Sequence, residues 1–138
     1  MVTPPRAGPA KGLPRAQRIR KRPEFLRIQD SPARVSTRHL LLLLGVRADE
    51  GPPRLGVVAS RKVGEAVARN RAKRLVRESF RLQQAAMPRG LDLVIVVRPG
   101  TAELGLAEVA GELHRATPQL ARRAAELARG EARRASTK

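Results

Sequence analysis

The residues best suited to chemistry in this sequence are cations gathered in one short stretch. Residues 60–81 hold eight basic and two acidic residues, and residues 69–81 read RNRAKRLVRESFR. Guanidinium groups donate paired hydrogen bonds whose geometry matches phosphate oxygens. Like charges three and four residues apart destabilise a helix, which favours an anionic partner over a merely solvated surface. The chemistry that this stretch indicates is therefore phosphate binding.

Side chains that could catalyse a reaction are few. The chain has no cysteine, which excludes disulfides, zinc knuckles and thiol catalysis. Its two histidines, His39 and His114, form no recognisable catalytic pattern with carboxylates or serines. We expect both to be structural or surface residues, and Glu78 to form a local ion pair with Arg74 or Arg81. The sequence predicts no catalytic residue and no metal site in the chain itself.

The overall charge also indicates a polyanionic partner. With 29 basic and 12 acidic residues among 138, the chain carries a formal net charge of +17. Such a charge repels itself in a compact fold, so nucleic acid and an acidic membrane surface are the candidate partners. The apolar runs are far shorter than the ~20 residues that span a bilayer, and the basic, proline-rich amino terminus does not resemble a secretory signal. We therefore predict a cytoplasmic protein with no membrane partner.

Composition divides the chain into three parts. Residues 1–19 are basic and rich in proline, and we predict a disordered arm there because they offer little apolar surface to bury. Residues 20–120 carry the periodic apolar patterns of one folded domain. Residues 121–138 are rich in alanine and arginine, and we predict a basic, frayed tail.

Apolar periodicity and turn residues place the elements of this domain. The expected elements, in chain order, are a helix from residue 20 that ends at 31–32, strands at 34–48 and 54–60 paired as a hairpin, a helix at 65–86, a strand at 91–97, and a helix from residue 101 that stops and restarts at 117–118. This order predicts an α+β fold with one sheet of about four strands and helices on one side.

The helix expected at 65–86 has two distinct faces. At 100° per residue, apolar residues fall on one side and cations on the other. The stripe expected to face the core comprises Ala68, Ala72, Leu75, Val76, Ser79 and Ala86, with Phe80 and Leu82 at its margins. The opposite face carries Asn70, Lys73, Arg74, Arg77 and Arg81, with Arg69 and Arg71 beside them. A row of cations on successive turns suits the phosphates of a nucleic-acid strand.

Nucleic acid is favoured over a membrane, because the helix lacks large apolar anchors beyond those that its core requires. Charge alone does not separate DNA from RNA, although the predicted sheet is not the frame of a helix-turn-helix protein. Aromatic platforms for stacking single strands are limited to Phe25 and Phe80, and we expect Phe80 to belong to the core.

The cationic stretch and its flanks resemble a known family. The run RNRAKRLVRESFR looks like the arginine-rich motif of the bacterial ribonuclease P protein component, and LGVVASRKVGEAVA before it resembles the strand and loop that precede that motif. RIRKRPEFLRI near the start and LDLVIVVRPG later are similar to the family's first helix and last strand. The resemblance covers residues 15–117, in the same order and spacing.

This resemblance implies both a fold and a function. The fold would be a two-layer αβββαβα sandwich, ribosomal-protein-like, with a left-handed βαβ crossover into the motif helix and with residues 34–48 as a bent or divided strand. The function would be that of the protein subunit of ribonuclease P, an endoribonuclease that removes the 5′ leader of precursor tRNA. Its partners would be the catalytic RNA subunit, one protein per RNA, and precursor tRNA. Mg²⁺ would be bound by that RNA, with no cofactor in the protein.

The resemblance also assigns roles to individual residues. Phe25 would bind the leader in a central cleft, where Gln29 and Leu43 occupy positions that the family often fills with aromatic residues. The RNA-binding residues would be Arg61, Lys62, Arg69, Asn70, Arg71, Lys73, Arg74, Arg77 and Arg81. Composition and charge alone also fit a structural, ribosomal-type RNA-binding protein with no processing role, or a metal-dependent nuclease. The motif is what favours the ribonuclease P subunit.

Overall fold

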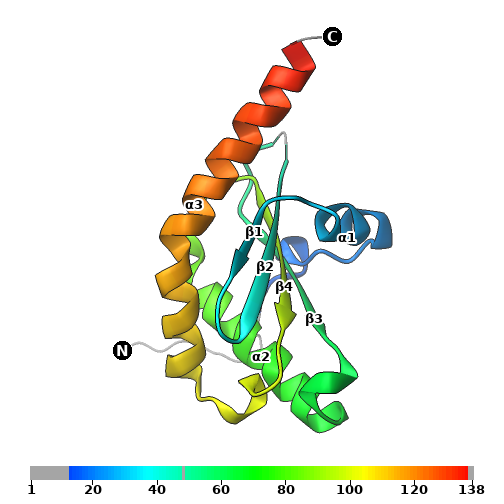
Figure 1. Ribbon diagram of the computed structural model, residues 1–138, viewed down its shortest axis with the longest axis vertical. Helices are drawn as coiled ribbons and strands as arrows, with labels where there is room; N and C mark the ends of the chain where they lie inside the picture. Colours follow the sequence, from blue (N-terminus) through cyan, green and yellow to red (C-terminus); the bar gives the residue numbers. More distant parts are fainter. Residues whose placement is uncertain (1–12, 48, 137–138) are drawn as a thin grey trace.

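The computed structural model describes residues 13–47 and 49–136, with the backbone alone for 131–136. Its helices and strands, in chain order, are α1 (Arg22–Gln29), β1 (Arg34–Ser36), β2 (Leu40–Val46), β3 (Arg54–Ala59), α2 (Ala66–Gln83), β4 (Leu91–Val97) and α3 (Leu106–Ser136). Figure 1 shows α2 and α3 packed on one side of the sheet and α1 on the other. The α+β class predicted from the sequence is confirmed. The prediction that the helices lie on one side of the sheet is wrong for α1, whose Ile28 packs on the opposite face from α2 and α3.

The four strands form one sheet in the order β1-β2-β4-β3. The predicted hairpin between 34–48 and 54–60 is wrong, because β4 lies between β2 and β3, antiparallel to the first and parallel to the second. A strand that is apolar on both faces is most stable in the centre of a sheet, and LDLVIVV is such a strand. The divided strand is confirmed, since β1 and β2 pair as a hairpin around residues 37–39. The left-handed crossover through α2 stays a prediction.

Side chains alternate between two apolar clusters, one on each face of the sheet. The larger cluster lies under α2 and α3, and Phe80 and Leu113 from these helices are 0% exposed. The smaller cluster lies under α1 and joins Ile28 to Leu43 and Val94. The sheet is therefore covered on both faces, which leaves the outer surface of α2 and the margin of α1 for contact with a partner.

The packing of α2 agrees with the predicted stripe except at its margins. Its buried residues are Ala72, Val76, Ser79 and Phe80. Phe80 is the centre of the buried face rather than its edge, whereas Leu82 is 55% exposed. Ala86 is exposed because the helix ends at Gln83, three residues before it.

The last helix continues through the predicted stop at 117–118. Pro118 lies inside α3 and has no N–H to donate to the carbonyl of His114, four residues earlier. The hydroxyl of Thr117 donates a hydrogen bond to that carbonyl at 2.7 Å, so the carbonyl is satisfied and the helix continues past Pro118. Leu120 and Ala124 are buried beyond this point, so the predicted tail begins as a packed helix.

The predicted disordered arm of 1–19 falls partly outside the described residues, which begin at 13. Within it, Leu13, Gln17 and Ile19 are buried, and the segment 13–19 lies beside β3. The amide of Gln17 donates to the carbonyl of Pro53 at 3.0 Å, and the N–H of Ile19 donates to the carbonyl of Leu55 at 2.9 Å. Residues 13–19 therefore belong to the folded domain. Sequence reasoning missed them because their apolar residues are sparse and lie among prolines and cations.

Candidate nucleic-acid interface

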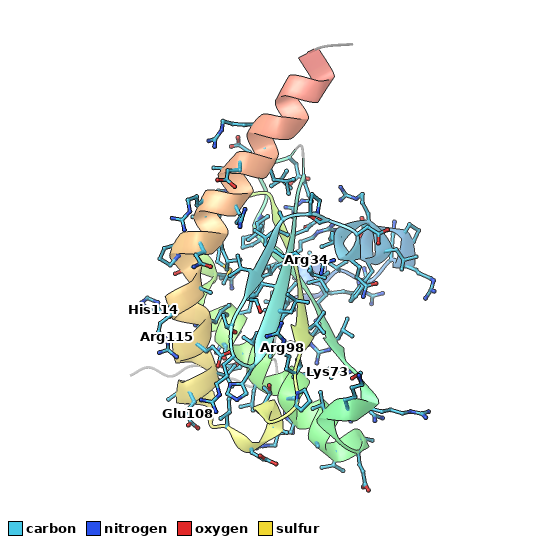
Figure 2. The ribbon with its side chains drawn as sticks, viewed as in Figure 1. Arg34, Lys73, Arg98, Glu108, His114 and Arg115 are labelled. Carbon is cyan, nitrogen blue, oxygen red and sulfur yellow. The ribbon has the colours of Figure 1, made fainter. Side chains whose placement is uncertain are left out.

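The cations of α2 spread over three sides of the helix. At 100° per residue, Arg74 and Arg81 lie opposite the buried stripe, and Arg71 lies on the flank toward α3. Asn70, Lys73 and Arg77 lie on the other flank, away from Arg71. Figure 2 shows Lys73 on the side of the molecule away from α3, which carries Glu108, His114 and Arg115. We call Asn70, Lys73, Arg74 and Arg77 the cationic face of α2.

Arg71 holds the loop before α3 as well as adding charge. Its Nε donates to the carbonyl of Ala102 at 2.7 Å, and its Nη2 donates to the carbonyl of Leu104 at 3.3 Å. The side chain is exposed, so its outer edge is still accessible. Replacing Arg71 would therefore remove two hydrogen bonds to this loop together with a charge, which makes Arg71 a poor probe of binding alone.

Arg81 forms an ion pair with Glu78. This is one of the two partners predicted for Glu78, the other being Arg74. The Nε of Arg81 lies 3.0 Å from Oε1 of Glu78, and its Nη2 also contacts that carboxylate. The hydrogen bond to Glu78 raises the pKa of Arg81. The pair cancels much of the local charge, so Arg81 contributes less to an anion site than the residues of the cationic face.

The remaining predicted cations precede α2 or turn inward. Arg61 and Lys62 are exposed in a short 3₁₀ turn, which Ser60 caps by accepting a hydrogen bond from the N–H of Lys62. Gly64 then takes φ = 143°, a backbone conformation that favours glycine, and α2 begins. Arg69 is half-buried, and its Nη1 donates to the carbonyl of Gly64 at 3.0 Å. Arg61 and Lys62 thus extend the cationic face, while Arg69 stabilises the turn that precedes it.

Phe25 lies across the sheet from α2. Its ring packs directly on β3 at Gly56, where an added Cβ would come within 2.6 Å of Cε2. Phe25 also joins the smaller cluster, together with the partly buried Leu41, Val58 and Val96. Of the other two predicted cleft positions, Leu43 is only 3% exposed and Gln29 is half-buried. Leu43 therefore belongs to the buried cluster under α1, and the accessible apolar strip is formed by Phe25 and its three partly buried neighbours.

A methyl group at position 56 is expected to displace Phe25. Gly56→Ala places a Cβ where the ring lies, so we expect a loss of about 1–3 kcal/mol in the free energy of unfolding and a reoriented ring. The chain has two Phe and no Tyr or Trp, so the ring protons of Phe25 are readily followed by NMR. Gly105→Ala, whose Cβ would meet its nearest neighbour at 3.7 Å, is the control. An unchanged Phe25 spectrum in Gly56→Ala would contradict this packing.

A buried carboxylate that sequence reasoning missed fixes the position of α1. Asp92 of β4 is 0% exposed on the α1 side of the sheet, 2.6 Å from Nη1 of Arg47 and 2.8 Å from Nη2 of Arg54. Arg27 of α1 lies 3.8 Å from Asp92, and Glu24 of α1 lies 3.6 Å from Arg54. The hydrogen bond to Asp92 raises the pKa of Arg54. This network links both edges of β4 to the helix that carries Phe25.

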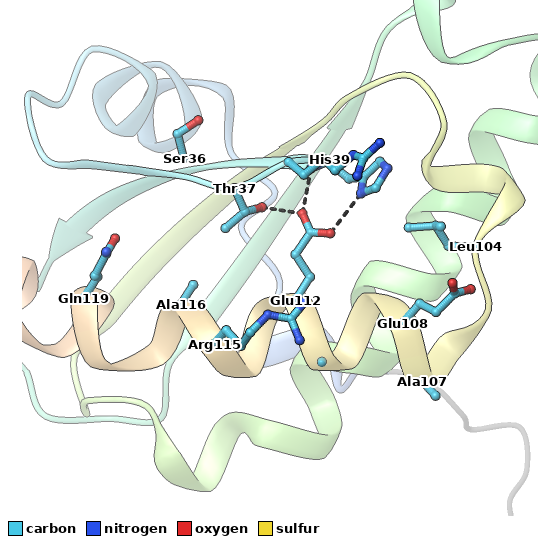
Figure 3. A pocket seen from close by; sticks show the side chains of 12 residues that line it. Ser36, Thr37, His39, Leu104, Ala107, Glu108, Glu112, Arg115, Ala116 and Gln119 are labelled. Carbon is cyan, nitrogen blue, oxygen red and sulfur yellow. Dashed lines mark hydrogen bonds and ion pairs between the residues drawn. The ribbon is translucent and has the colours of Figure 1, made fainter.

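The turn that joins β1 to β2 is tied to α3 by a second carboxylate, that of Glu112 (Figure 3). Glu112 accepts hydrogen bonds from the hydroxyl of Thr37 at 2.5 Å and from the backbone N–H of His39 at 2.6 Å, and its other oxygen lies 2.9 Å from Nδ1 of His39. These contacts give His39 a structural role, as predicted. His114 is exposed on α3.

The Glu112 contacts predict acid sensitivity. Burial raises the pKa of Glu112, but the hydrogen bonds from Thr37 and His39 outweigh it and hold the pKa below its ordinary value of 4.5. A depressed carboxylate pKa gives stability that is present above the unfolded value and is lost as pH falls through the folded value. We expect the free energy of unfolding of the wild type to fall below about pH 4.5, and that of Glu112→Gln to fall less there. Parallel pH profiles of the two proteins would contradict this.

The described residues contain neither a metal-binding cluster nor a membrane-spanning helix. No group of three or more His, Asp or Glu side chains in that part of the chain is arranged to hold a metal ion. None of the described helices has the length and apolar character needed to cross a membrane.

An α+β domain that exposes an arginine-rich helix face on one side of its sheet defines a class of small basic proteins suited to nucleic acid. Comparison with known proteins identifies the family within this class. The family model named Ribonuclease P matches residues 13–121. The ribonuclease P protein component of Desulfovibrio desulfuricans is 45% identical over 104 residues, which cover 73% of this chain and 80% of that protein. That of Azotobacter vinelandii is 45% identical over 101 residues, or 72% and 76% of the two chains.

Solved structures agree with the sequence relatives. The ribonuclease P protein from Thermotoga maritima is 31% identical with a TM-score of 0.65, over 72% of this chain and 94% of that one. The Staphylococcus aureus protein is 27% identical with a TM-score of 0.65, over 73% and 92%. The chain belongs to the family of ribonuclease P protein components. It is thus a protein subunit of that endoribonuclease, and family membership implies partnership with the RNA subunit.

Proposed function

We propose that this chain binds the catalytic RNA subunit through the cationic face of α2, and that it promotes removal of the 5′ leader from precursor tRNA. The observation that carries the proposal is that Lys73, Arg74 and Arg77 lie off the buried stripe of a helix whose other side forms the core. The same helix is thereby rigid and available for contact. Arg61 and Lys62 extend this surface at its amino-terminal end.

A second surface suits the unpaired leader of precursor tRNA. The apolar strip of Phe25, Leu41, Val58 and Val96 lies on the opposite face of the sheet from α2 and is partly exposed. One aromatic ring offers a single stacking position. The leader would therefore be held mainly by apolar contact with this strip and by attraction to the cations of α1 and the segment before it. In this arrangement the protein lies between two RNAs, one protein per catalytic RNA, in the cytoplasm.

The mechanism that follows is electrostatic. Catalytic RNA and precursor tRNA repel each other over about a Debye length, roughly 8–10 Å at physiological salt. A protein with a net charge of +17 between them lowers this repulsion and releases condensed counterions from both. Mg²⁺ bound by the RNA subunit would supply the hydrolytic chemistry. The chain itself positions the leader and needs no nucleophile or general base.

The test is reconstitution with the cognate catalytic RNA and precursor tRNA. Leader removal is measured at low Mg²⁺, with and without the purified chain. We expect the chain to increase the rate of cleavage and to lower the Mg²⁺ concentration that cleavage requires. If the chain binds RNA but leaves leader removal unchanged, the processing role is rejected and a purely structural RNA-binding role is left. The family match does not favour that alternative.

A further inference from the structure

A hollow between α3 and the turn that joins β1 to β2 has no role in the proposed function. Its volume is about 520 Å³, within the range of sites that hold small organic molecules. One wall is the turn, residues 36–39, and the other is a stripe of α3 that carries Ala107, Gly111, Arg115 and Gln119 (Figure 3). These four are spaced by four residues and so lie on one face of the helix. We call this hollow the α3 pocket.

The back of the α3 pocket is formed before any ligand arrives. Figure 3 shows Glu112 reaching from α3 to Thr37 and His39 in the turn, and Glu112 is only 8% exposed. The contact between Nδ1 of His39 and Glu112 orients the imidazole ring, whose Nε2 forms no hydrogen bond with the described residues. A wall that is already ordered saves part of the entropy that binding otherwise costs.

The charges that line the α3 pocket favour an anion. Both carboxylates are engaged within the protein, since Glu112 contacts the turn and Glu108 accepts a hydrogen bond from the N–H of Gly105 at 2.8 Å. The two arginines of the pocket, Arg38 and Arg115, are exposed and form no hydrogen bond or ion pair with any residue that the structure describes. The charge available to a ligand is therefore positive.

Gly111 makes room for one of these guanidinium groups. A Cβ at position 111 would lie 3.5 Å from Nη1 of Arg115, so the guanidinium folds back over the preceding turn of α3, along the pocket. Glycine inside a helix is less stable than alanine, so this residue costs helix stability. In return, the floor of the pocket stays open beside a cation.

We propose that the α3 pocket binds a nucleotide, with the phosphate at Arg38 and Arg115 and the base against the apolar wall at the start of α3. That wall comprises Leu104, Ala107 and Gly111. Guanidinium groups pair with phosphate oxygens and also stack on flat rings, so they suit both parts of such a ligand. An inorganic anion would meet the charges but would leave the apolar wall uncovered.

Such a nucleotide has two sources, the free mononucleotides of the cell and an unpaired nucleotide of RNA. The second source rests on the proposed function, whereas the pocket itself does not. Figure 2 shows Arg115 and Lys73 on different sides of the molecule. An RNA nucleotide bound here would therefore make a contact separate from the cationic face of α2.

The first experiment needs no RNA. Adenosine 5′-monophosphate (AMP) is titrated into the full chain at fixed pH and ionic strength, and the ring protons of histidine and phenylalanine are followed by NMR. Of the two histidines only His39 lines the pocket, while His114 is exposed elsewhere on α3. We expect a saturable shift at His39 and little change at His114. A saturable shift at Phe25 with none at His39 would place AMP on the apolar strip across the sheet and would overturn the proposal.

Variants test the two parts of the pocket separately. Arg38→Met and Arg115→Met should each weaken AMP binding roughly tenfold. Gly111→Leu fills the floor without changing the charge and should abolish the shift, whereas Gly111→Ala, whose Cβ makes an ordinary contact, should bind like the wild type. Arg122→Met, two turns further along the same face and outside the pocket, is the matched control.

Two results would overturn the assignment. Wild-type affinity for AMP in Arg38→Met, Arg115→Met and Gly111→Leu would show that AMP does not bind in this pocket. Equal affinity of the wild type for AMP and for inorganic phosphate would show an anion site without a base contact. Neither result bears on the proposed function.

The second experiment separates the two sources by comparing wild type and Gly111→Leu in binding to the cognate catalytic RNA and to precursor tRNA. If RNA supplies the nucleotide, we expect Gly111→Leu to weaken binding of one of them roughly tenfold and AMP to compete with it. If the ligand is a free mononucleotide, both RNAs should bind the variant within about twofold of the wild type. If the wild type fails to bind either RNA, the proposed function fails, while the AMP titration still decides whether the α3 pocket is a nucleotide site.

Discussion

Replacing Asp92 with asparagine is expected to lower the free energy of unfolding by about 3–5 kcal/mol. The carboxylate is 0% exposed and neutralises Arg47 and Arg54, whose side chains are only 13% and 20% exposed. Asparagine keeps the shape but removes the charge, so two largely buried guanidinium groups are left without compensation. The free energy of unfolding of a small domain is only about 5–15 kcal/mol, so the variant should be close to unfolding at physiological temperature.

The measurement is urea unfolding followed by circular dichroism, because the chain has no tryptophan. Asp49→Asn is the matched control, since Asp49 also pairs with Arg47, at 3.1 Å, but its side chain is 66% exposed. We expect its unfolding midpoint to stay close to that of the wild type. Equal midpoints for Asp92→Asn and the wild type would show that the network adds nothing to stability.

Asp92 also shows where prediction from the sequence stops. Its strand, 91–97, is predictable to the residue because an apolar run bounded by turns has one local interpretation. The partners of the strand are set by tertiary packing, and no local pattern shows that β4 separates β2 from β3. The role of Asp92 could therefore not be predicted from its strand alone, because it depends on hydrogen bonds from Arg47, just after β2, and from Arg54 of β3.

The candidate site was predictable to a similar degree. The period of α2 separates Ala72, Val76 and Phe80 from the cations, because burial of an amphipathic helix follows from its own sequence. What each cation contacts depends on elements distant in the chain. Arg71, for example, donates to the carbonyls of Ala102 and Leu104, which lie 31 and 33 residues later in the chain.

Removing two charges from the cationic face of α2 is expected to separate binding from folding. Lys73→Ala with Arg74→Ala should weaken binding to the catalytic RNA by roughly a hundredfold, about tenfold for each phosphate contact. The slope of log affinity against log salt should become shallower by roughly 1.4–1.8, since two fewer phosphates are neutralised. Both residues lie off the buried stripe, so the thermal unfolding midpoint should change little.

The control for this variant removes the same charge elsewhere. Arg122→Ala with Arg129→Ala takes two exposed cations from α3, on a part of the helix beyond residue 121, where the family match ends. If RNA binding depended only on net charge, both double variants would weaken it equally and flatten the salt dependence alike. If α2 docks against the phosphates, the α3 variant should stay within about twofold of the wild type at physiological salt, because solvent screens charges that are not in contact. Equal losses in the two variants would therefore exclude α2 as the docking surface, even if leader cleavage were still stimulated.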